Sequence, residues 1–117
     1  MRFEDMEIWK RSARLSAELY KHFSGHGDFG FRDQITRSSL SVPSNIAEGA
    51  ERESGKDFMR FLQYAKGSCG ELRTQIYIGM DIGYIEPEKG RSWLQESKEL
   101  SAMIVAFINS IRKTTEH

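Results

Sequence analysis

The chain has 117 residues, enough for a modest hydrophobic core, so we expect residues 1–117 to form a single domain. Its 17 Lys and Arg residues balance 17 Asp and Glu residues. This balance argues against a protein whose main task is to grip a phosphate backbone. Cys69 is the only cysteine, which excludes an intramolecular disulfide and disfavours a cysteine-based metal site.

The N-terminal segment is charged and lacks the apolar stretch of a secretory signal peptide. No other segment approaches the ~20 apolar residues of a membrane span. A single cysteine also suits a reducing compartment. We therefore expect a cytoplasmic protein that does not bind membranes.

The first predicted helix covers about residues 3–24. Its apolar residues occupy about half of the helix circumference at 100° per residue, which is more than one bundle interior needs. Charged residues share the opposite side; the basic ones are Lys10, Arg11, Arg14 and Lys21. Glycines at positions 25, 27 and 30 then favour a turn.

The second predicted helix covers about residues 31–52 and contains Pro43. Proline has no N–H to donate to the carbonyl of Ser39, and its ring crowds the preceding turn. We therefore favour one helix with a kink. The alternative is two short helices, with Ser41 capping the second.

The third predicted helix begins after Ser54, which forms a capping-box-like pair with Asp57, and it runs to about Ile82. Its apolar residues follow the 4-3 alternation of a bundle seam. They are Phe58, Leu62, Ala65, Cys69, Leu72, Ile76 and Gly79. Four small residues at 67–70 predict a close crossing by another helix, because glycine in mid-helix costs roughly 1 kcal/mol against alanine.

Gly83 is a natural helix stop, and Pro87 suits the first turn of a fourth helix that frays past Arg112. Four long helices with short connections predict an all-α, antiparallel up-and-down bundle. Tyr64, Tyr77 and Ile78 lie off the seam of the third helix, and an exposed apolar face on so small a protein indicates an interface. We therefore expect a homo-oligomer.

A polar seam accompanies the proline. It consists of Ser41, Pro43, Asn45 and Glu48 on the second helix and Ser68, Glu71 and Gln75 on the third. One interpretation is a polar pocket or a ligand set for a small cation. The favoured one is a hydrogen-bond network that fixes helix packing around the kink.

Other chemistry is poorly supported by the sequence. A di-iron bundle needs Glu-x-x-His on facing helices, whereas His22, His26 and His117 lie near predicted loops or the terminus. Cys69 lies on the apolar seam, where a buried, inert thiol is expected. We therefore expect no catalytic residue, metal or cofactor.

A basic cluster, Arg52, Lys56 and Arg60, recurs at four-residue spacing and could contact phosphates. Acidic residues are interleaved with it, at Glu51, Glu53 and Asp57. Interleaved charges are typical of a solvated surface with ion pairs. Nucleic-acid binding through this cluster is therefore the secondary hypothesis.

The run at residues 41–49 and several shorter segments resemble the four-helix bundle family also called the 23S rRNA-intervening sequence proteins. The segments are 3–5, Trp9, 34–35, 37–39, 57–58, 60–62, 65–68, 71–75 and 83–85. The resemblance implies an up-and-down bundle that assembles into a ring, typically a pentamer, with no established catalytic residue.

Some members of that family are encoded within intervening sequences of bacterial 23S ribosomal RNA genes. A related group serves as the accessory protein of diversity-generating retroelements, where a pentamer contacts a reverse transcriptase and nucleic acid. This chain lacks the basic surplus of that group. The favoured expectation is therefore a non-enzymatic, ring-forming assembly or adaptor protein with a protein partner, and the alternative is an RNA- or DNA-binding accessory protein.

Overall fold

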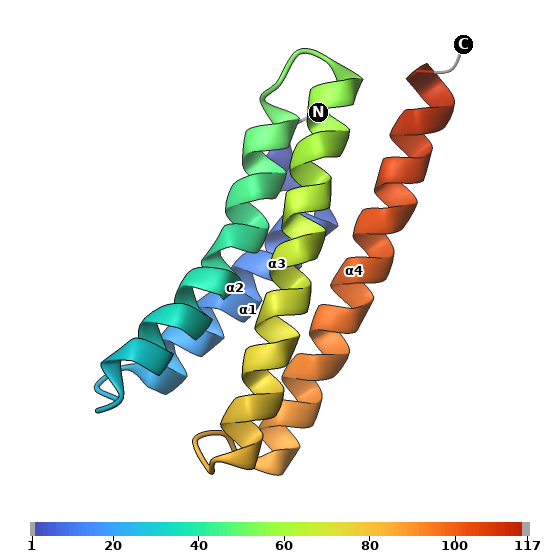
Figure 1. The fold of residues 1–117 in the computed structure, drawn as a ribbon. Helices are drawn as coiled ribbons and strands as arrows, with labels where there is room; N and C mark the ends of the chain where they lie inside the picture. The colour runs from blue at the N-terminus through green and yellow to red at the C-terminus, as the bar shows by residue number, and fades with distance from the viewer. Residues whose placement is uncertain (1, 116–117) are drawn as a thin grey trace.

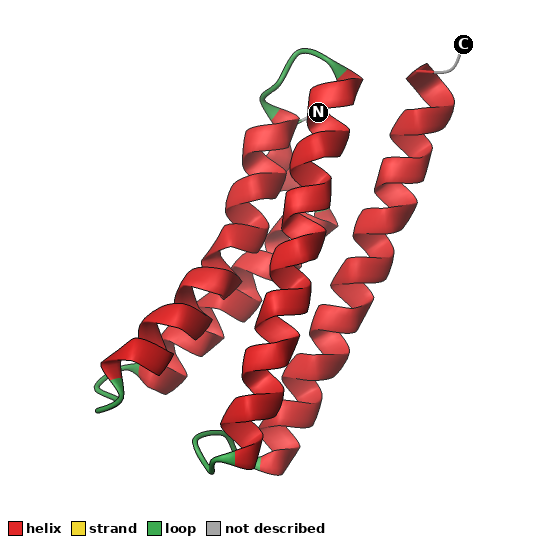
Figure 2. Ribbon diagram, in the orientation of Figure 1, coloured by secondary structure: helices red, strands yellow, loops and turns green. Residues whose placement is uncertain are grey.

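The computed structural model describes residues 2–115, so His117 lies outside the described part of the chain. These residues form a short 3-10 turn and four α-helices, without strands (Figures 1 and 2). The elements are η1 (Phe3–Asp5), α1 (Glu7–Phe23), α2 (Phe29–Ala50), α3 (Gly55–Asp81) and α4 (Pro87–Thr115). The prediction of an all-α, four-helix protein is confirmed.

Successive helices run in opposite directions and pack side by side, and α4 returns to contact α1 (Figure 1). The pair α2–α3 forms the most extensive contact and α1–α4 the weakest of the helix pairs. The molecule measures 51 × 21 × 20 Å. None of the helices within residues 2–115 combines the length and apolar content that crossing a membrane requires.

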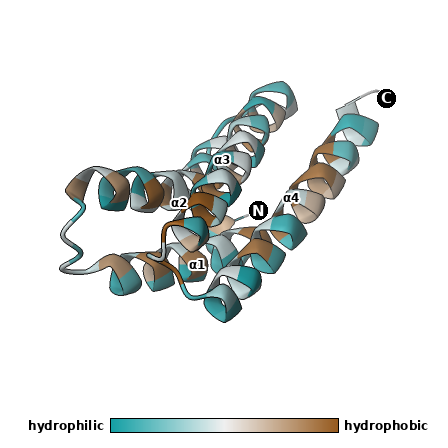
Figure 3. Cartoon of the chain, turned by 60° about the horizontal axis from the view of Figure 1, so that its bottom comes forward, coloured by the Kyte–Doolittle hydropathy of each residue, from teal (hydrophilic) through white to brown (hydrophobic). Residues whose placement is uncertain are grey.

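Hydrophobic and hydrophilic residues alternate along each helix (Figure 3), and the buried hydrophobic residues of the helices form one core cluster. The predicted seam of α3 is buried throughout except at Phe58, which is half-buried. The largest side chains that are almost fully buried include Phe23, Leu19, Ile35, Ile46, Leu62, Leu72, Ile76, Leu100 and Ile104.

Helix boundaries follow local capping. Asp28 accepts a hydrogen bond from the N–H of Phe31 at 3.1 Å, and this cap starts α2 two residues earlier than predicted. Ser54 caps α3 by accepting from the N–H of Asp57 at 3.1 Å, as predicted. Gly83 has φ of +83° just after α3 ends, as a helix-terminating glycine should.

The first helix is shorter than predicted, because Met6 has extended backbone (φ −81°, ψ 128°) and separates η1 from α1. Met6 is buried at 4 % exposure, so its place in the core fixes this break. At the other end of the chain, α4 continues to Thr115, beyond the predicted fraying at Arg112.

The second helix is continuous through Pro43, so the alternative of two short helices is wrong, and Ser41 is an interior residue rather than a cap. Pro43 is itself buried. The hydrogen bond that its missing N–H would give to the carbonyl of Ser39 is absent by chemistry.

The close helix crossing predicted at residues 67–70 is wrong for both glycines of that run. A Cβ added to Gly67 would meet nothing within 4 Å, and one added to Gly70 would meet only Arg73 Nη2, at 4.0 Å. The close approach lies elsewhere: a Cβ on Gly49 would stand 2.9 Å from both Phe58 Cδ1 and Phe61 Cβ. A Cβ on Gly79 would also stand 3.1 Å from Phe31 Cζ, so glycine lets α2 and α3 approach near both ends of the pair, and not at mid-helix.

Candidate functional site

The polar seam contains one hydrogen bond between helices. The hydroxyl of Ser41 lies 2.6 Å from the hydroxyl of Ser68 and 3.0 Å from the carbonyl oxygen of Ser38. Asn45 Nδ2 donates to the carbonyl oxygen of Ser41 at 2.8 Å, within α2. The seam thus ties α2 to α3 at a single point beside Pro43.

The remaining members of the predicted seam do not join a common network. Glu48 is exposed and pairs with Arg52 on its own helix, at 2.7 Å. Glu71 is exposed on α3. Gln75 is half-buried, and its Oε1 is buried without a hydrogen-bond partner. The structure therefore brings Ser41 and Ser68 together but does not bring Glu48 to Glu71.

A second serine contact, which sequence reasoning missed, joins α1 to α2. The hydroxyls of Ser16 and Ser39 lie 3.0 Å apart and are buried. Ser39 also donates to the carbonyl of Thr36 at 2.7 Å. The available signal was Ser12 and Ser16, one turn apart on the apolar arc of the first helix, where both are buried.

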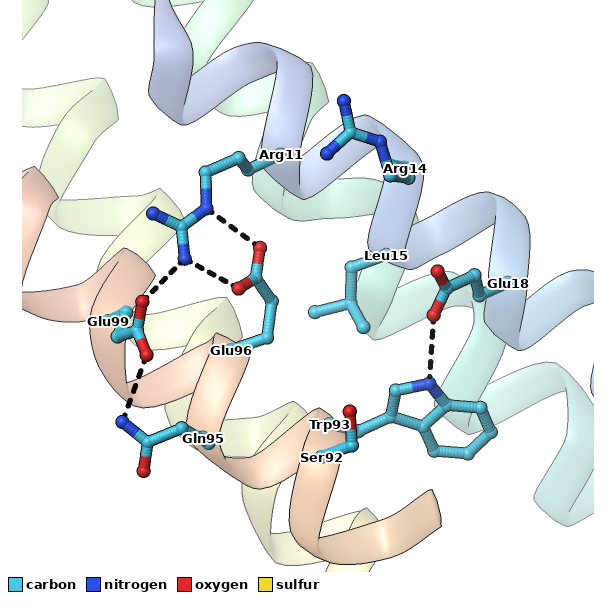
Figure 4. Close-up of a pocket in the computed structure, with 9 residues that line it drawn as sticks. All are labelled: Arg11, Arg14, Leu15, Glu18, Ser92, Trp93, Gln95, Glu96 and Glu99. Atoms are coloured by element: carbon cyan, nitrogen blue, oxygen red, sulfur yellow. Dashed lines mark hydrogen bonds and ion pairs between the residues drawn. The ribbon is translucent and has the colours of Figure 1, made fainter.

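A polar crossing between α1 and α4 was also missed. Arg11 Nε donates to Glu96 Oε2 at 2.9 Å, while Nη2 bonds the other oxygen of Glu96 and also Glu99 Oε1, the latter at 2.7 Å (Figure 4). Nearby, Trp93 Nε1 donates to Glu18 Oε2 at 3.1 Å. Arg11 was predicted on the outer, solvated face of the first helix, but its side chain bridges α1 and α4.

These groups line an open recess of about 410 Å³ between α1 and α4. The hydrogen bonds that Arg11 donates to Glu96 and Glu99 raise the pKa of Arg11 above its ordinary value. The pKa of Glu99 is lowered, first by Gln95 Nε2 and then by Arg11. Arg11, Glu96 and Glu99 are therefore engaged with one another, which favours a structural role for this part of the recess, whereas Arg14 also lines it without an ion-pair partner within residues 2–115.

The predicted basic cluster is largely neutralised. Arg52 pairs with Glu48, and Arg60 pairs with Asp57 at 3.3 Å. Both guanidinium groups also lie over the ring of Phe61, at 4.8 and 5.1 Å from its centroid. Lys56 is exposed and is not part of an ion pair within residues 2–115. The three side chains are thus arranged around an aromatic ring and do not form a free basic patch.

The predicted interface residues are all exposed: Tyr64 by 49 %, Tyr77 by 52 % and Ile78 by 47 %. At 100° per residue, Tyr64 and Ile78 lie about 40° apart on α3, whereas Tyr77 lies about 140° from Tyr64. Ile82, 52 % exposed, continues the side of Tyr64 and Ile78. We call Tyr64, Ile78 and Ile82 the α3 stripe; Tyr77 faces the α4 side instead.

A second apolar surface lies between α1 and α2. It is a groove of about 550 Å³ whose lining includes Trp9, Ala17, Tyr20, Leu40 and Pro43. Tyr20 and Leu40 are exposed by 44 % and 47 %. We call it the α1–α2 groove; it shares no residue with the α3 stripe.

Cys69 is fully buried, and burial raises the pKa of its thiol, which disfavours the reactive thiolate. Within residues 2–115, no three His, Cys, Asp or Glu side chains converge as metal ligands would.

Comparison with known proteins fits this architecture. The sequence model of the 23S rRNA-intervening sequence protein family matches residues 4–106, which is most of the chain and includes the polar seam and the α3 stripe. The chain belongs to this family. No curated protein sequence matches it significantly.

A solved structure from Bacteroides thetaiotaomicron, described as a protein of unknown function from the S23 ribosomal protein family, is similar to this chain with a TM-score of 0.81. The sequences are 24 % identical, and the match covers 86 % of this chain and 97 % of the other. At this level of identity, the structural similarity establishes the fold of this chain and says nothing about its role.

Proposed function

We propose that this family member is a non-enzymatic assembly protein, whose copies join into a ring that acts as an adaptor for a protein partner in the cytoplasm. The observation that carries the proposal is the exposure of two different apolar surfaces, the α3 stripe and the α1–α2 groove. Two different surfaces that fit each other give a head-to-tail contact, which closes into a ring when its rotation allows. We propose a ring of five from the family resemblance.

The two surfaces differ in form as such a contact requires. The α3 stripe presents side chains outward, with Tyr64 and Ile78 about half exposed. The α1–α2 groove is concave, and its exposed surface is mainly apolar. Burying both apolar surfaces between copies would stabilise the assembly, because each Å² of buried apolar area contributes about 25 cal/mol.

Pro43 has a place in this proposal. It is buried at the floor of the α1–α2 groove, beside the exposed Leu40. We propose that the missing hydrogen bond to Ser39 bends α2 and thereby opens the groove. The resistance of Cys69 to forming a thiolate is consistent with a protein that acts by contact.

Three matched substitutions test the assembly by light scattering after size-exclusion chromatography. Ile78→Lys removes the stripe, Leu40→Lys blocks the groove, and Val105→Lys alters an exposed apolar residue on α4 that belongs to neither surface. We expect a mass near five chains for the wild type and for Val105→Lys, and one chain for each of the other two.

Mixing the two monomeric variants gives the decisive result. In a head-to-tail contact, the intact groove of Ile78→Lys can bind the intact stripe of Leu40→Lys, so the mixture should form a dimer that cannot grow. Failure to form this dimer, or a wild type that remains a single chain at tens of micromolar, would contradict the proposal.

A further inference from the structure

Charge is unevenly distributed over this electrically balanced chain. Lys66 and Arg73 are seven residues apart on α3, and Arg91 and Lys98 are seven apart on α4, so each pair lies within about 20° on its helix. Arg73 bonds to Ser97 and Ser101 of α4, which brings the two rows side by side. We call Lys66, Arg73, Arg91 and Lys98 the basic face.

The basic face is not neutralised in the way that the cluster around Phe61 is. Within residues 2–115, none of its four members belongs to an ion pair. Helical periodicity places Asp81 and Glu88 nearest to it, both at the end of the bundle where α3 meets α4. Lys66, Arg91 and Lys98 are exposed.

Arg73 is held in place by neutral partners. Its Nη1 donates to Ser101 Oγ at 2.8 Å, to Ser97 Oγ at 3.1 Å and to the carbonyl oxygen of Ser97 at 3.3 Å. Its Nη2 lies over Gly70, 4.0 Å from where a Cβ would be. The guanidinium is thus oriented without a counter-charge, and the missing side chain at Gly70 leaves room for an anion to approach Nη2.

Tyr77 completes this surface. It follows Arg73 by one turn, about 40° away on the same side of α3, and its side chain is 52 % exposed. An exposed aromatic ring among cations is typical of surfaces that bind single strands, where bases stack on the ring and phosphates meet the cations. Gly67 and Gly70 on α3 carry no side chains, so they leave the helix surface next to Tyr77 uncovered.

We propose that the basic face binds single-stranded nucleic acid, with phosphates on Lys66, Arg73, Lys98 and Arg91 and a base stacked on Tyr77. Helical periodicity, together with the contact of Arg73 with α4, places the cations along the α3–α4 seam, about 10 Å apart along each helix. A linear array suits a chain of phosphates better than a compact anion. The planar fork of arginine also matches phosphate geometry. Stacking accepts any base, so binding should be sequence-tolerant.

This proposal does not rest on ring assembly. Tyr77 lies about 140° from Tyr64 around α3, so the basic face and the α3 stripe can be occupied at the same time. A ring would repeat the basic face once per chain. Light scattering reports the assembly, and oligonucleotide binding reports the basic face, so failure of one proposal can be told from failure of the other.

The test is fluorescence anisotropy of a labelled 15-nucleotide single-stranded RNA over a series of salt concentrations. Lys66→Glu with Lys98→Glu should weaken binding at least tenfold. The matched control, Lys10→Glu with Lys89→Glu, makes the same change in net charge at exposed lysines on other faces and should change binding less than threefold. Circular dichroism melting verifies that each variant is folded.

Two single variants separate the contributions. Arg73→Gln should weaken binding and lower the slope of log affinity against log salt by about one, as the loss of one phosphate contact does. Tyr77→Ala should weaken binding several-fold without changing that slope, because stacking releases no counterions.

Three results would overturn the proposal. The first is no binding of the RNA at low salt. The second is an equal loss of affinity in the two double variants. The third is that polyglutamate of similar length displaces the RNA as effectively as unlabelled RNA does, while Tyr77→Ala leaves binding unchanged. The last result would assign the face to acidic protein segments.

Discussion

The hydroxyls of Ser41 and Ser68 lie 2.6 Å apart and form a hydrogen bond between α2 and α3, two residues before Pro43. Ser68 is 9 % exposed, so little water competes for this bond. The contact lies mid-way along the most extensive helix pair, where it can fix the axial register of α2 against α3. A one-turn slip would leave both hydroxyls without this partner.

A double-mutant cycle measures this bond. Ser41→Ala and Ser68→Ala should each lower the free energy of unfolding by about 1 kcal/mol, and the double variant should cost less than the sum, because the bond is lost only once. Urea denaturation gives the values. Ser44→Ala, an exposed serine on the same helix, is the control. Strict additivity would show that the two hydroxyls are not coupled.

Two glycine substitutions should have opposite effects. Gly49→Ala places a Cβ 2.9 Å from Phe58 and Phe61, which overpacks the α2–α3 contact and should cost about 1–3 kcal/mol. Gly67→Ala meets nothing within 4 Å and should stabilise the single chain by up to about 1 kcal/mol through helix propensity. Thermal melting distinguishes the two. Destabilisation by Gly67→Ala would show that another chain packs on this position.

Pro43→Ala tests the proposed bend. The substitution restores an N–H for the carbonyl of Ser39, so α2 should straighten, and the mass measured by light scattering should fall while helical circular dichroism is retained. Pro87→Ala, at the first position of α4, should leave assembly unchanged because proline is naturally accommodated there. Normal assembly of Pro43→Ala with unchanged stability would make the proline incidental.

The cap of α2 should make stability depend on acid pH. The N–H of Phe31, and then the hydroxyl of Tyr84, lower the pKa of Asp28. A carboxylate with a lowered folded-state pKa stabilises the fold above its unfolded pKa of about 3.9, and this contribution is lost as the pH falls through the folded value. The effect should be modest, since Asp28 is exposed.

Asp28→Asn provides the comparison, because asparagine caps helices but does not titrate. In urea denaturation between pH 6 and pH 2.5, wild-type stability should fall more steeply below about pH 4.5 than that of the variant. Parallel curves would show that the carboxylate has no lowered pKa.

The prediction of α3 succeeds because it depends on interactions between residues that are close in the sequence. The 4-3 spacing of Leu62, Ala65, Cys69 and Leu72 specifies one helix face whatever packs against it. Ser54 and Gly83 set the ends of α3 through hydrogen bonds and backbone freedom within a few residues. Asp28 was not predicted as a cap, because the glycines on either side of it made the start of α2 hard to locate from the sequence.

The polar contacts between helices could not be predicted from the sequence. Arg11 was expected on a solvated face, and only the rotation of α1 relative to α4 places its guanidinium between Glu96 and Glu99. The partners of Ser16 and Arg73 depend in the same way on the axial register of neighbouring helices. Periodicity fixes the face on which a residue lies, but its partner depends on how entire helices pack together. The four helices, their buried faces and most of their ends could be predicted from the sequence, because they depend on interactions within one or two turns. Which polar groups meet could be seen only in the folded chain, because helix rotation and register are set collectively by the packing of the core.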